Sequence, residues 1–317
     1  MRVRNFALGA LAAAAVALSL MNASWLAPMP AGRLVLVAHR GVAQPVDRAA
    51  AQGCSAARIA ASGHNFIENT LFSMHNAVRF GARGLALDVQ ASADGHAVVF
   101  RDPELDCRTD GTGAVRDRPL SYLRRLDVGH GYTADGGRSF PLRGRGRGAM
   151  PTAAEVIRAF PGETLIFTLR DAAGAEALVA AFAEANVEIG DRHGFAGAPA
   201  ALGALRRLTA AGFTLDPAAS DACLAAYRRT GWLGIVPAGC EGATLLLPRR
   251  GGWTLWGWPY RFLDRMAGAG ARFLIAGERA GDVLVGLERP EQLGEVPRHY
   301  RGLLLIEDMH DTGRALQ

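Results

Sequence analysis

The stretch Leu34-Val35-Leu36-Val37-Ala38-His39-Arg40-Gly41 joins a continuous apolar run to a histidine, an arginine and a glycine. A short run of this kind is typical of a strand that is buried on both faces, as in a parallel sheet. His39 and Arg40 then fall at the carboxyl end of the strand, where parallel α/β folds place their chemistry. An imidazole can move protons near neutral pH, and a guanidinium suits a phosphate or a carboxylate. The stretch predicts an α/β fold with a site at this strand end; a histidine that only caps the strand is the alternative.

Strand-like and helical patterns alternate along the rest of the chain, and the alternation indicates βα units around a parallel sheet. Half of the 317 residues are hydrophobic, which is enough for a large core. The count of strands predicts a single-domain (β/α)8 TIM barrel over residues 33–317. Besides the first strand, the candidates are residues 85–89, 97–100, 164–169, 213–215, 234–236, 244–247, 272–276 and 303–306.

The first 32 residues form a separate N-terminal segment. Arg2 and Arg4 give it a basic start, and no further charge occurs before Arg33. The apolar stretch between them approaches the ~20 residues that span a bilayer. We therefore expect an uncleaved membrane anchor over residues 1–32, with a cleaved signal peptide as the alternative. Either reading predicts that the globular part is exported.

The formal net charge is +5, and every one of the 35 basic residues is arginine. This balance permits an acidic substrate or an anionic membrane surface but selects neither. No feature of the sequence indicates a nucleic-acid partner.

Cysteine usage agrees with export. None of the four cysteines has the C-x-x-C spacing of a zinc site, and an even number in an exported chain favours disulfides. Closeness in sequence makes Cys223–Cys240 the easier pair, which leaves Cys54 with Cys107. Three connectivities are possible, and free buried cysteines are the alternative.

Further polar residues follow predicted strands or precede helices. Glu68-Asn69-Thr70 stands at the start of a helical pattern, where Asn69 or Thr70 makes a good N-cap and Glu68 complements the helix dipole. Asp88 lies near the end of a predicted strand, and Arg101-Asp102 follows the next one. Trp253, Trp256 and Trp258 crowd one loop, either as core packing or as a wall for an apolar part of a substrate.

In order and spacing, these motifs resemble the glycerophosphodiester phosphodiesterase family. The resemblance is densest over residues 35–128. It is carried by His39-Arg40-Gly41, Glu68-Asn69-Thr70, Asp88, the Asp94-Gly95 turn, Val98-Val99-Phe100-Arg101-Asp102 and Leu105-Asp106-Cys107-Arg108-Thr109. Trp256-Gly257-Trp258-Pro259 is similar to a later feature of exported, membrane-anchored members.

The resemblance implies a TIM barrel that hydrolyses glycerophosphodiesters to glycerol 3-phosphate and an alcohol. It also implies a divalent cation, calcium or magnesium, held by carboxylates, and two histidines as general base and acid. On the family pattern, His39 aligns with the first catalytic histidine and Arg40 with the phosphate-binding arginine. Asp88 aligns with one metal ligand, and Glu68 is the second candidate ligand.

Several positions depart from the family pattern. Ala86 stands where the family has a metal-binding glutamate, and Arg101 where it has the second catalytic histidine. Arginine stays protonated at ordinary pH, so it cannot act as a general acid. Thr168 and Arg170 replace a further metal ligand and a lysine, and Ile306-Glu307 replaces a Thr-Asp or Thr-Asn pair.

Two hypotheses follow. In the first, the protein is a metal-assisted hydrolase in which His39 moves protons and Arg40 binds phosphate. Glu68 and Asp88 then hold the cation, with Asp102 or Glu104 in place of the carboxylate missing at residue 86.

In the second hypothesis, the protein is a non-catalytic relative that binds a phosphodiester or a lipid headgroup through Arg40, Arg101 and Arg170. Ala86 and Thr168 remove anionic groups from the family pattern, and Arg101 and Arg170 provide cationic ones. That change favours an anion over a metal.

Overall fold

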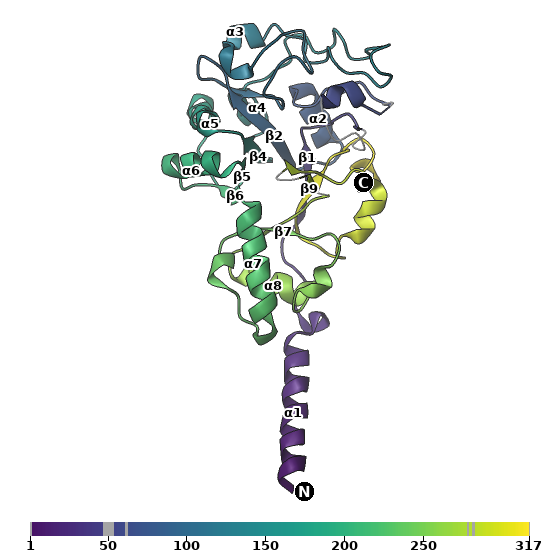
Figure 1. Ribbon diagram of the computed structural model, residues 1–317, viewed down its shortest axis with the longest axis vertical. Coiled ribbons are helices and arrows are strands. Elements are labelled where there is room, and N and C mark those ends of the chain that lie inside the picture. Colours follow the sequence, from purple (N-terminus) through teal and green to yellow (C-terminus); the bar gives the residue numbers. More distant parts are fainter. Residues whose placement is uncertain (1, 47–53, 61–62, 278, 281–282, 317) are drawn as a thin grey trace. The chain divides into compact units, whose positions relative to one another are not determined.

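The computed structural model describes residues 2–46, 54–60, 63–277, 279–280 and 283–316 (Figure 1). Its Cα packing divides the chain into two compact units. The larger unit comprises Val35–Leu215, Gly277–Leu293 and Leu304–Gln317, and the smaller unit comprises Met1–Leu34, Asp216–Ala276 and Gly294–Leu303. Each unit is therefore assembled from segments that lie far apart in the sequence.

The larger unit is built on a sheet in which β1 pairs with β2, β2 with β4, β4 with β5 and β5 with β6, all in parallel. β11 lies beside β1, and β3 pairs with β2 in the antiparallel sense. The strands are β1 (Leu34–His39), β2 (Gly84–Ala91), β3 (Ala97–Val99), β4 (Thr164–Leu169), β5 (His193–Gly197), β6 (Phe213–Leu215) and β11 (Gly302–Ile306), with a separate hairpin of β9 (Arg279–Ala280) and β10 (Val283–Leu284).

Helices follow the strands of the larger unit, and α5 packs against β2 and β4 as well as against α4 and α6. Local sequence sets their first residues. Thr70 caps α2 by accepting a bond from the amide of Ser73, and Thr152 and Glu155 form a reciprocal capping box on α4. The helices are α2 (Leu71–Arg79), α3 (Leu120–Leu123), α4 (Ala153–Ala159), α5 (Ala172–Ala185) and α6 (Pro199–Leu208), with short 3-10 turns η2 (Ser55–Arg58), η3 (Val115–Asp117), η7 (Pro290–Glu295) and η8 (Arg314–Leu316).

The register of the sheet sets which side chains share its carboxyl edge. His39, the last residue of β1, lies opposite Ala86 of β2, and Asp88 lies opposite Thr168 of β4. Because parallel strands all end at the same edge, the residues that follow β1, β2 and β4 gather there.

The smaller unit contains β7 and β8, which pair in parallel, and three helices. Arg265 of α8 links them: it donates to the carbonyl of Met21 at the end of α1 and to the hydroxyl of Tyr227 in α7. The elements are α1 (Arg2–Met21), α7 (Pro217–Thr230), α8 (Tyr260–Gly268), β7 (Thr244–Leu247), β8 (Arg272–Ile275), and the turns η1 (Ser24–Leu26), η4 (Gly231–Leu233), η5 (Ala238–Cys240) and η6 (Gly252–Thr254).

The predicted α/β class is confirmed: in the described residues, eight strands make up the parallel set, six in the larger unit and β7 and β8 in the smaller. One predicted strand is wrong. Residues 234–236 form a turn, because Gly234 has a φ of 78° and Ile235 is exposed. The strand β5 was missed because its sequence, His-Gly-Phe-Ala-Gly, contains no β-branched residue. One domain over residues 33–317 stays a prediction.

The N-terminal segment forms the 20-residue helix α1, in which Phe6, Leu8 and Leu11 are exposed. None of the helices that the structure describes has both the length and the apolar character needed to cross a membrane. The membrane anchor over residues 1–32 and the export of the globular part stay predictions.

Both expected disulfides are present, Cys54–Cys107 in the larger unit and Cys223–Cys240 in the smaller. The loop that contains Trp253, Trp256 and Trp258 is only partly buried. Trp253 is 82% exposed and Trp256 is 44% exposed, whereas Trp258 packs against Phe262 with ring centroids 5.7 Å apart.

Replacing each disulfide by a pair of alanines tests its contribution. The Cys54–Cys107 bridge joins residues 53 positions apart and the Cys223–Cys240 bridge residues 17 apart. From the entropy of the closed loops, we expect the free energy of unfolding to fall by about 4 kcal/mol without the first bridge and about 3 kcal/mol without the second. Urea unfolding under oxidising conditions measures both losses. Unchanged unfolding midpoints would contradict the assigned bridges.

Candidate functional site

The end of β1 is fixed by main-chain hydrogen bonds. The amide of Arg40 donates to the carbonyl of Ala86 at 2.7 Å, and the amide of Asn69 donates to the carbonyl of Arg40 at 2.9 Å. Arg40 has a φ of 63°, and Gly41 follows with a φ of 79°. A Cβ at Gly41 would lie 2.5 Å from Oγ of Ser73, so only glycine fits there. The backbone thus turns sharply and directs the Arg40 guanidinium into the larger unit.

Glu307, which directly follows β11, joins His39 to Arg40. Nδ1 of His39 lies 2.6 Å from one carboxylate oxygen of Glu307, and the amide of Gly286 donates to that same oxygen at 3.0 Å. The guanidinium of Arg40 donates to the other oxygen. Because a carboxylate only accepts, Nδ1 is the donor in this pair, which leaves Nε2 of His39 to accept a proton.

Glu68 is buried between two guanidinium groups. Its Oε1 lies 3.2 Å from Nη1 of Arg40 and 2.9 Å from Nη1 of Arg108. Burial by itself would raise the pKa of Glu68, but the charges of Arg108 and Arg40 outweigh burial and lower that pKa to about 2. Glu68 is therefore a permanent anion at physiological pH, and its charge is balanced within the protein.

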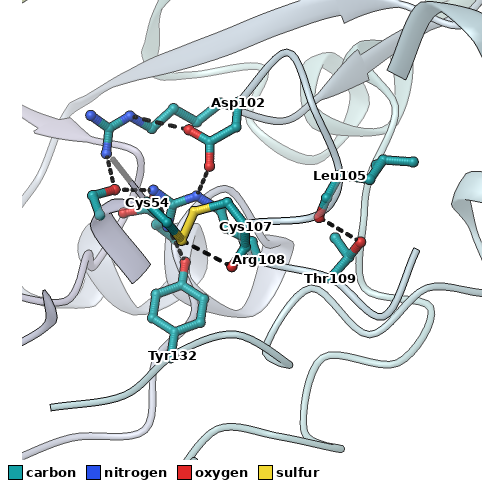
Figure 2. Close-up of a disulfide and its surroundings, with 10 residues drawn as sticks. Cys54, Asp102, Leu105, Cys107, Arg108, Thr109 and Tyr132 are labelled. Atoms are coloured by element: carbon teal, nitrogen blue, oxygen red, sulfur yellow. Dashed lines mark hydrogen bonds and ion pairs between the residues drawn. A yellow bond between two sulfur atoms is a disulfide. The ribbon is translucent and has the colours of Figure 1, made fainter. Parts of the chain in front are cut away.

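Arg108, the second arginine beside Glu68, lies next to the Cys54–Cys107 disulfide (Figure 2). Its Nε donates to Asp102 at 2.7 Å, and Nη1 donates to the hydroxyl of Tyr132 at 2.7 Å. Burial is the main reason that the pKa of Tyr132 is raised, although the charge of Arg108 opposes this effect. Tyr132 thus acts as a neutral hydrogen-bonding partner.

Arg101 is more accessible than Arg40 and Arg108, with 31% of its side chain exposed. One of its Nη atoms donates to the hydroxyl of Ser55 at 2.9 Å, and Arg170 donates to its backbone carbonyl at 2.7 Å. Burial, and then the nearby charge of Arg40, lower the pKa of Arg101. A small pocket of the larger unit is lined by residues that include Arg101, Arg108 and Glu68.

Asp88 lies apart from the carboxylate of Glu68 in the hydrogen-bond network. Its Oδ2 accepts a long bond of 3.4 Å from the side-chain amide of Asn69. Opposite it in the sheet stands Thr168, and Ala86 occupies the strand position two residues before it. Neither neighbour brings a second carboxylate to Asp88.

These residues do not fit the divalent cation that the family resemblance implied. The predicted ligand Glu68 has both arginines on its Oε1, and both oxygens of Glu307 and one of Asp102 are likewise engaged. In the described part of the chain, no group of three histidine, cysteine or acidic residues is arranged to hold a metal. Guanidinium groups provide the positive charge beside Oε1 of Glu68. The pairing of Glu68 with Asp88 around a metal stays a prediction.

The structure brings together most of the predicted site residues. His39, Arg40 and Glu68 share one network through Glu307, and Arg101 and Arg170 meet at its exposed side. Sequence reasoning missed the role of Arg108, although its motif had been noted. It also missed Tyr132, which lies in a glycine-rich stretch without a helix or strand pattern and is 1% exposed.

A parallel α/β fold with a charged cluster where its strands end is the arrangement of an α/β-barrel protein that binds its ligand at that edge. Residues 60–192 match the Glycerophosphoryl diester phosphodiesterase family, which is the family that the motifs resemble. His39 and Arg40 lie just before the matched residues.

Similar proteins include the uncharacterised protein Rv2277c of Mycobacterium tuberculosis, 33% identical over 130 residues, which are 41% of this chain and 43% of that protein. A glycerophosphodiester phosphodiesterase of Caldanaerobacter subterraneus subsp. tengcongensis is 43% identical over 65 residues, 20% of this chain and 27% of the relative. The matched segments thus span less than half the length of these relatives.

Solved structures agree on the fold. The glycerophosphoryl diester phosphodiesterase domain of Rv2277c has a TM-score of 0.62 at 19% identity and covers 90% of this chain and 98% of that domain. An Oleispira antarctica phosphodiesterase in complex with the product sn-glycerol-3-phosphate has a TM-score of 0.53 at 19% identity, with 91% and 97% of the two chains covered. At these identities the likeness concerns the fold alone.

The depressed pKa of Glu68 makes stability depend on pH. Its pKa falls from 4.5 to about 2 on folding, so its contribution is complete above pH 4.5 and is lost as the pH falls toward 2. We expect the free energy of unfolding to drop by about 3 kcal/mol over this window. Glu68→Gln should lower stability at pH 7 by about 3–5 kcal/mol and flatten the acid slope.

Urea unfolding at pH 7, 5, 4 and 3 measures these changes. Glu176→Gln, an exposed position on α5, is the matched control and should leave both the midpoint and the slope unchanged. An acid slope that is the same in Glu68→Gln as in the parent protein would show that Glu68 is not the titrating group.

Proposed function

We propose that this chain is a phosphodiester hydrolase that acts on glycerophosphodiesters and releases glycerol 3-phosphate and an alcohol. The observation that carries the proposal is the contact between His39 Nδ1 and Glu307, next to Arg40 and at the carboxyl end of β1. This contact orients the imidazole of His39 beside cationic groups. The chain that carries it matches the phosphodiesterase family over residues 60–192.

In this reaction, a water molecule adds to phosphorus and loses a proton to Nε2 of His39, while the bond from phosphorus to the leaving alcohol breaks. Glu307 holds the imidazole in the tautomer that accepts this proton and stabilises the imidazolium that forms. Arg101, on the exposed side of the cluster, faces the phosphoryl oxygens and offsets their developing charge.

The leaving alcohol takes its proton from His39 or from water, because Arg101 cannot donate one. The absence of a second positioned acid costs about 10²–10⁴ in rate. We therefore expect slow turnover.

A second candidate function is favoured by Arg108. This residue joins Glu68 and Asp102 in a closed, buried network, where the family resemblance implied a metal. A site of this kind could bind a phosphodiester or a lipid headgroup through Arg101 and Arg170 without turning it over.

Hydrolysis of glycerophosphocholine distinguishes the two functions. We expect slow release of glycerol 3-phosphate that persists in EDTA, since the residues present do not fit a divalent cation. His39→Ala should lower kcat about 10²-fold or more. His75→Ala, an exposed histidine on α2, is the matched control and should retain the parent rate.

Calorimetric titration with glycerol 3-phosphate completes the test. Binding without turnover, with or without calcium or magnesium, would refute the hydrolase and support the second candidate. Turnover that requires an added divalent cation would contradict the metal-free arrangement of Glu68 and Arg108.

The role of Arg101 can be tested by the same titration. If Arg101 contacts the phosphoryl group, Arg101→Ala should weaken binding of glycerol 3-phosphate about 10–100-fold, the value of one charge-assisted hydrogen bond. Arg116→Ala, whose side chain is 78% exposed in the same unit, is the control. Equal affinities of the two variants would remove Arg101 from the binding site.

A further inference from the structure

Exposed apolar side chains are concentrated in the smaller unit. Large hydrophobic residues are normally buried, and a gathering of exposed ones marks an interaction surface. In the larger unit, the exposed examples among the described residues are Phe72 and Leu208. Those of the smaller unit are Phe6, Leu8, Leu11, Val16, Leu20, Met21, Trp25, Leu26, Met29, Trp232, Leu233, Ile235, Trp253 and Trp256.

Several of these side chains lie together where α1 ends. The side-chain amide of Asn22 donates to the carbonyl of Trp232 at 2.9 Å. A Cβ built on Gly234 would lie 3.5 Å from Sδ of Met21, so the η4 turn contacts the last residue of α1. Figure 1 shows α1 projecting from the end of the smaller unit at which α7 finishes.

Arg265 makes this junction rigid. Its guanidinium donates to the carbonyls of Met21 and Gly231 and to the side chain of Asn22, at 2.9–3.0 Å. The bond to Met21 satisfies a carbonyl at the end of α1 that a helix leaves without an intrahelical partner. The apolar residues of η1 and η4 are therefore held in fixed positions beside the helix end.

The tryptophans have the chemistry of residues at a membrane surface. Nε1 of Trp232 donates to the carbonyl of Arg229, and Nε1 of Trp256 donates to the carbonyl of Arg228. The polar atoms are thus satisfied, while 40% of Trp232 and 44% of Trp256 are exposed. Amphipathic rings of this kind are enriched at the level of lipid headgroups.

The charge of the smaller unit is strongly positive. Its sequence contains twelve arginines and five acidic residues, a formal net charge of +7, whereas the larger unit carries −2 of the total of +5. Arg228 and Arg229 are exposed next to the tryptophans. Each basic residue near an anionic bilayer contributes to its binding, and the contribution weakens with salt.

We propose that a docking face of the smaller unit, made of Trp25, Leu26, Trp232, Leu233 and Ile235 with Arg228 and Arg229, binds the surface of an anionic lipid bilayer. The apolar side chains enter the headgroup region, and the arginines pair with lipid phosphates. This contact is made by the globular unit itself, whether or not α1 crosses the bilayer, and it does not depend on catalysis in the larger unit.

Vesicle flotation of the full chain tests the proposal. Wild-type protein should bind vesicles that contain phosphatidylglycerol more tightly than pure phosphatidylcholine vesicles, and the preference should shrink at high salt. The double substitution Leu233→Asp and Ile235→Asp should weaken binding about tenfold or more. Leu208→Asp, an equally exposed leucine of the larger unit, is the matched control.

Fluorescence quenching by brominated lipids reports on the face even if α1 alone retains the chain on the vesicle. Trp232→Phe should remove a large part of the quenched fluorescence, and Trp258→Phe, a packed tryptophan, should remove little. Equal quenching losses in these two variants would overturn the proposal. The proposal would also be overturned if sedimentation showed a dimer that the double substitution abolishes while vesicle binding stays unchanged.

Discussion

The carboxylate of Glu68 between the guanidinium groups of Arg40 and Arg108 is the interaction on which the site of the larger unit depends. All three groups are almost fully buried, and removing Glu68 would leave two guanidinium groups side by side away from water. Arg40 connects this centre to β1 and Glu307, and Arg108 connects it to Tyr132 and Asp102. The positions of the outer residues therefore follow from one buried charge balance.

The sequence was sufficient for the α/β class, the strand-end placement of His39 and Arg40, and both disulfides. Each of these depends on a local pattern: an apolar run, a motif that follows it, or cysteine spacing. The partners of the buried carboxylates were not predictable in this way. Arg108 reaches Glu68 and Tyr132 only through tertiary packing, so no local pattern indicated that two arginines contact Glu68.

The two units divide the chemistry of the chain. The larger unit has a slight net negative charge and holds Arg40 and Arg108 in buried pairs with carboxylates, whereas the smaller unit is basic and displays apolar rings. The disulfides respect this division, since each one closes a loop inside a single unit. Site chemistry and surface recognition are thus separable by mutation, because the residues for each lie in different cross-linked frameworks.

The bond between His39 and Glu307 joins residues that are 268 positions apart. Contacts of such separation carry a large loop-closure entropy. The imidazole acquires its carboxylate partner only where β1 and β11, one near each end of the chain, lie side by side. Any reaction that needs this pair therefore depends on the correct association of these two strands.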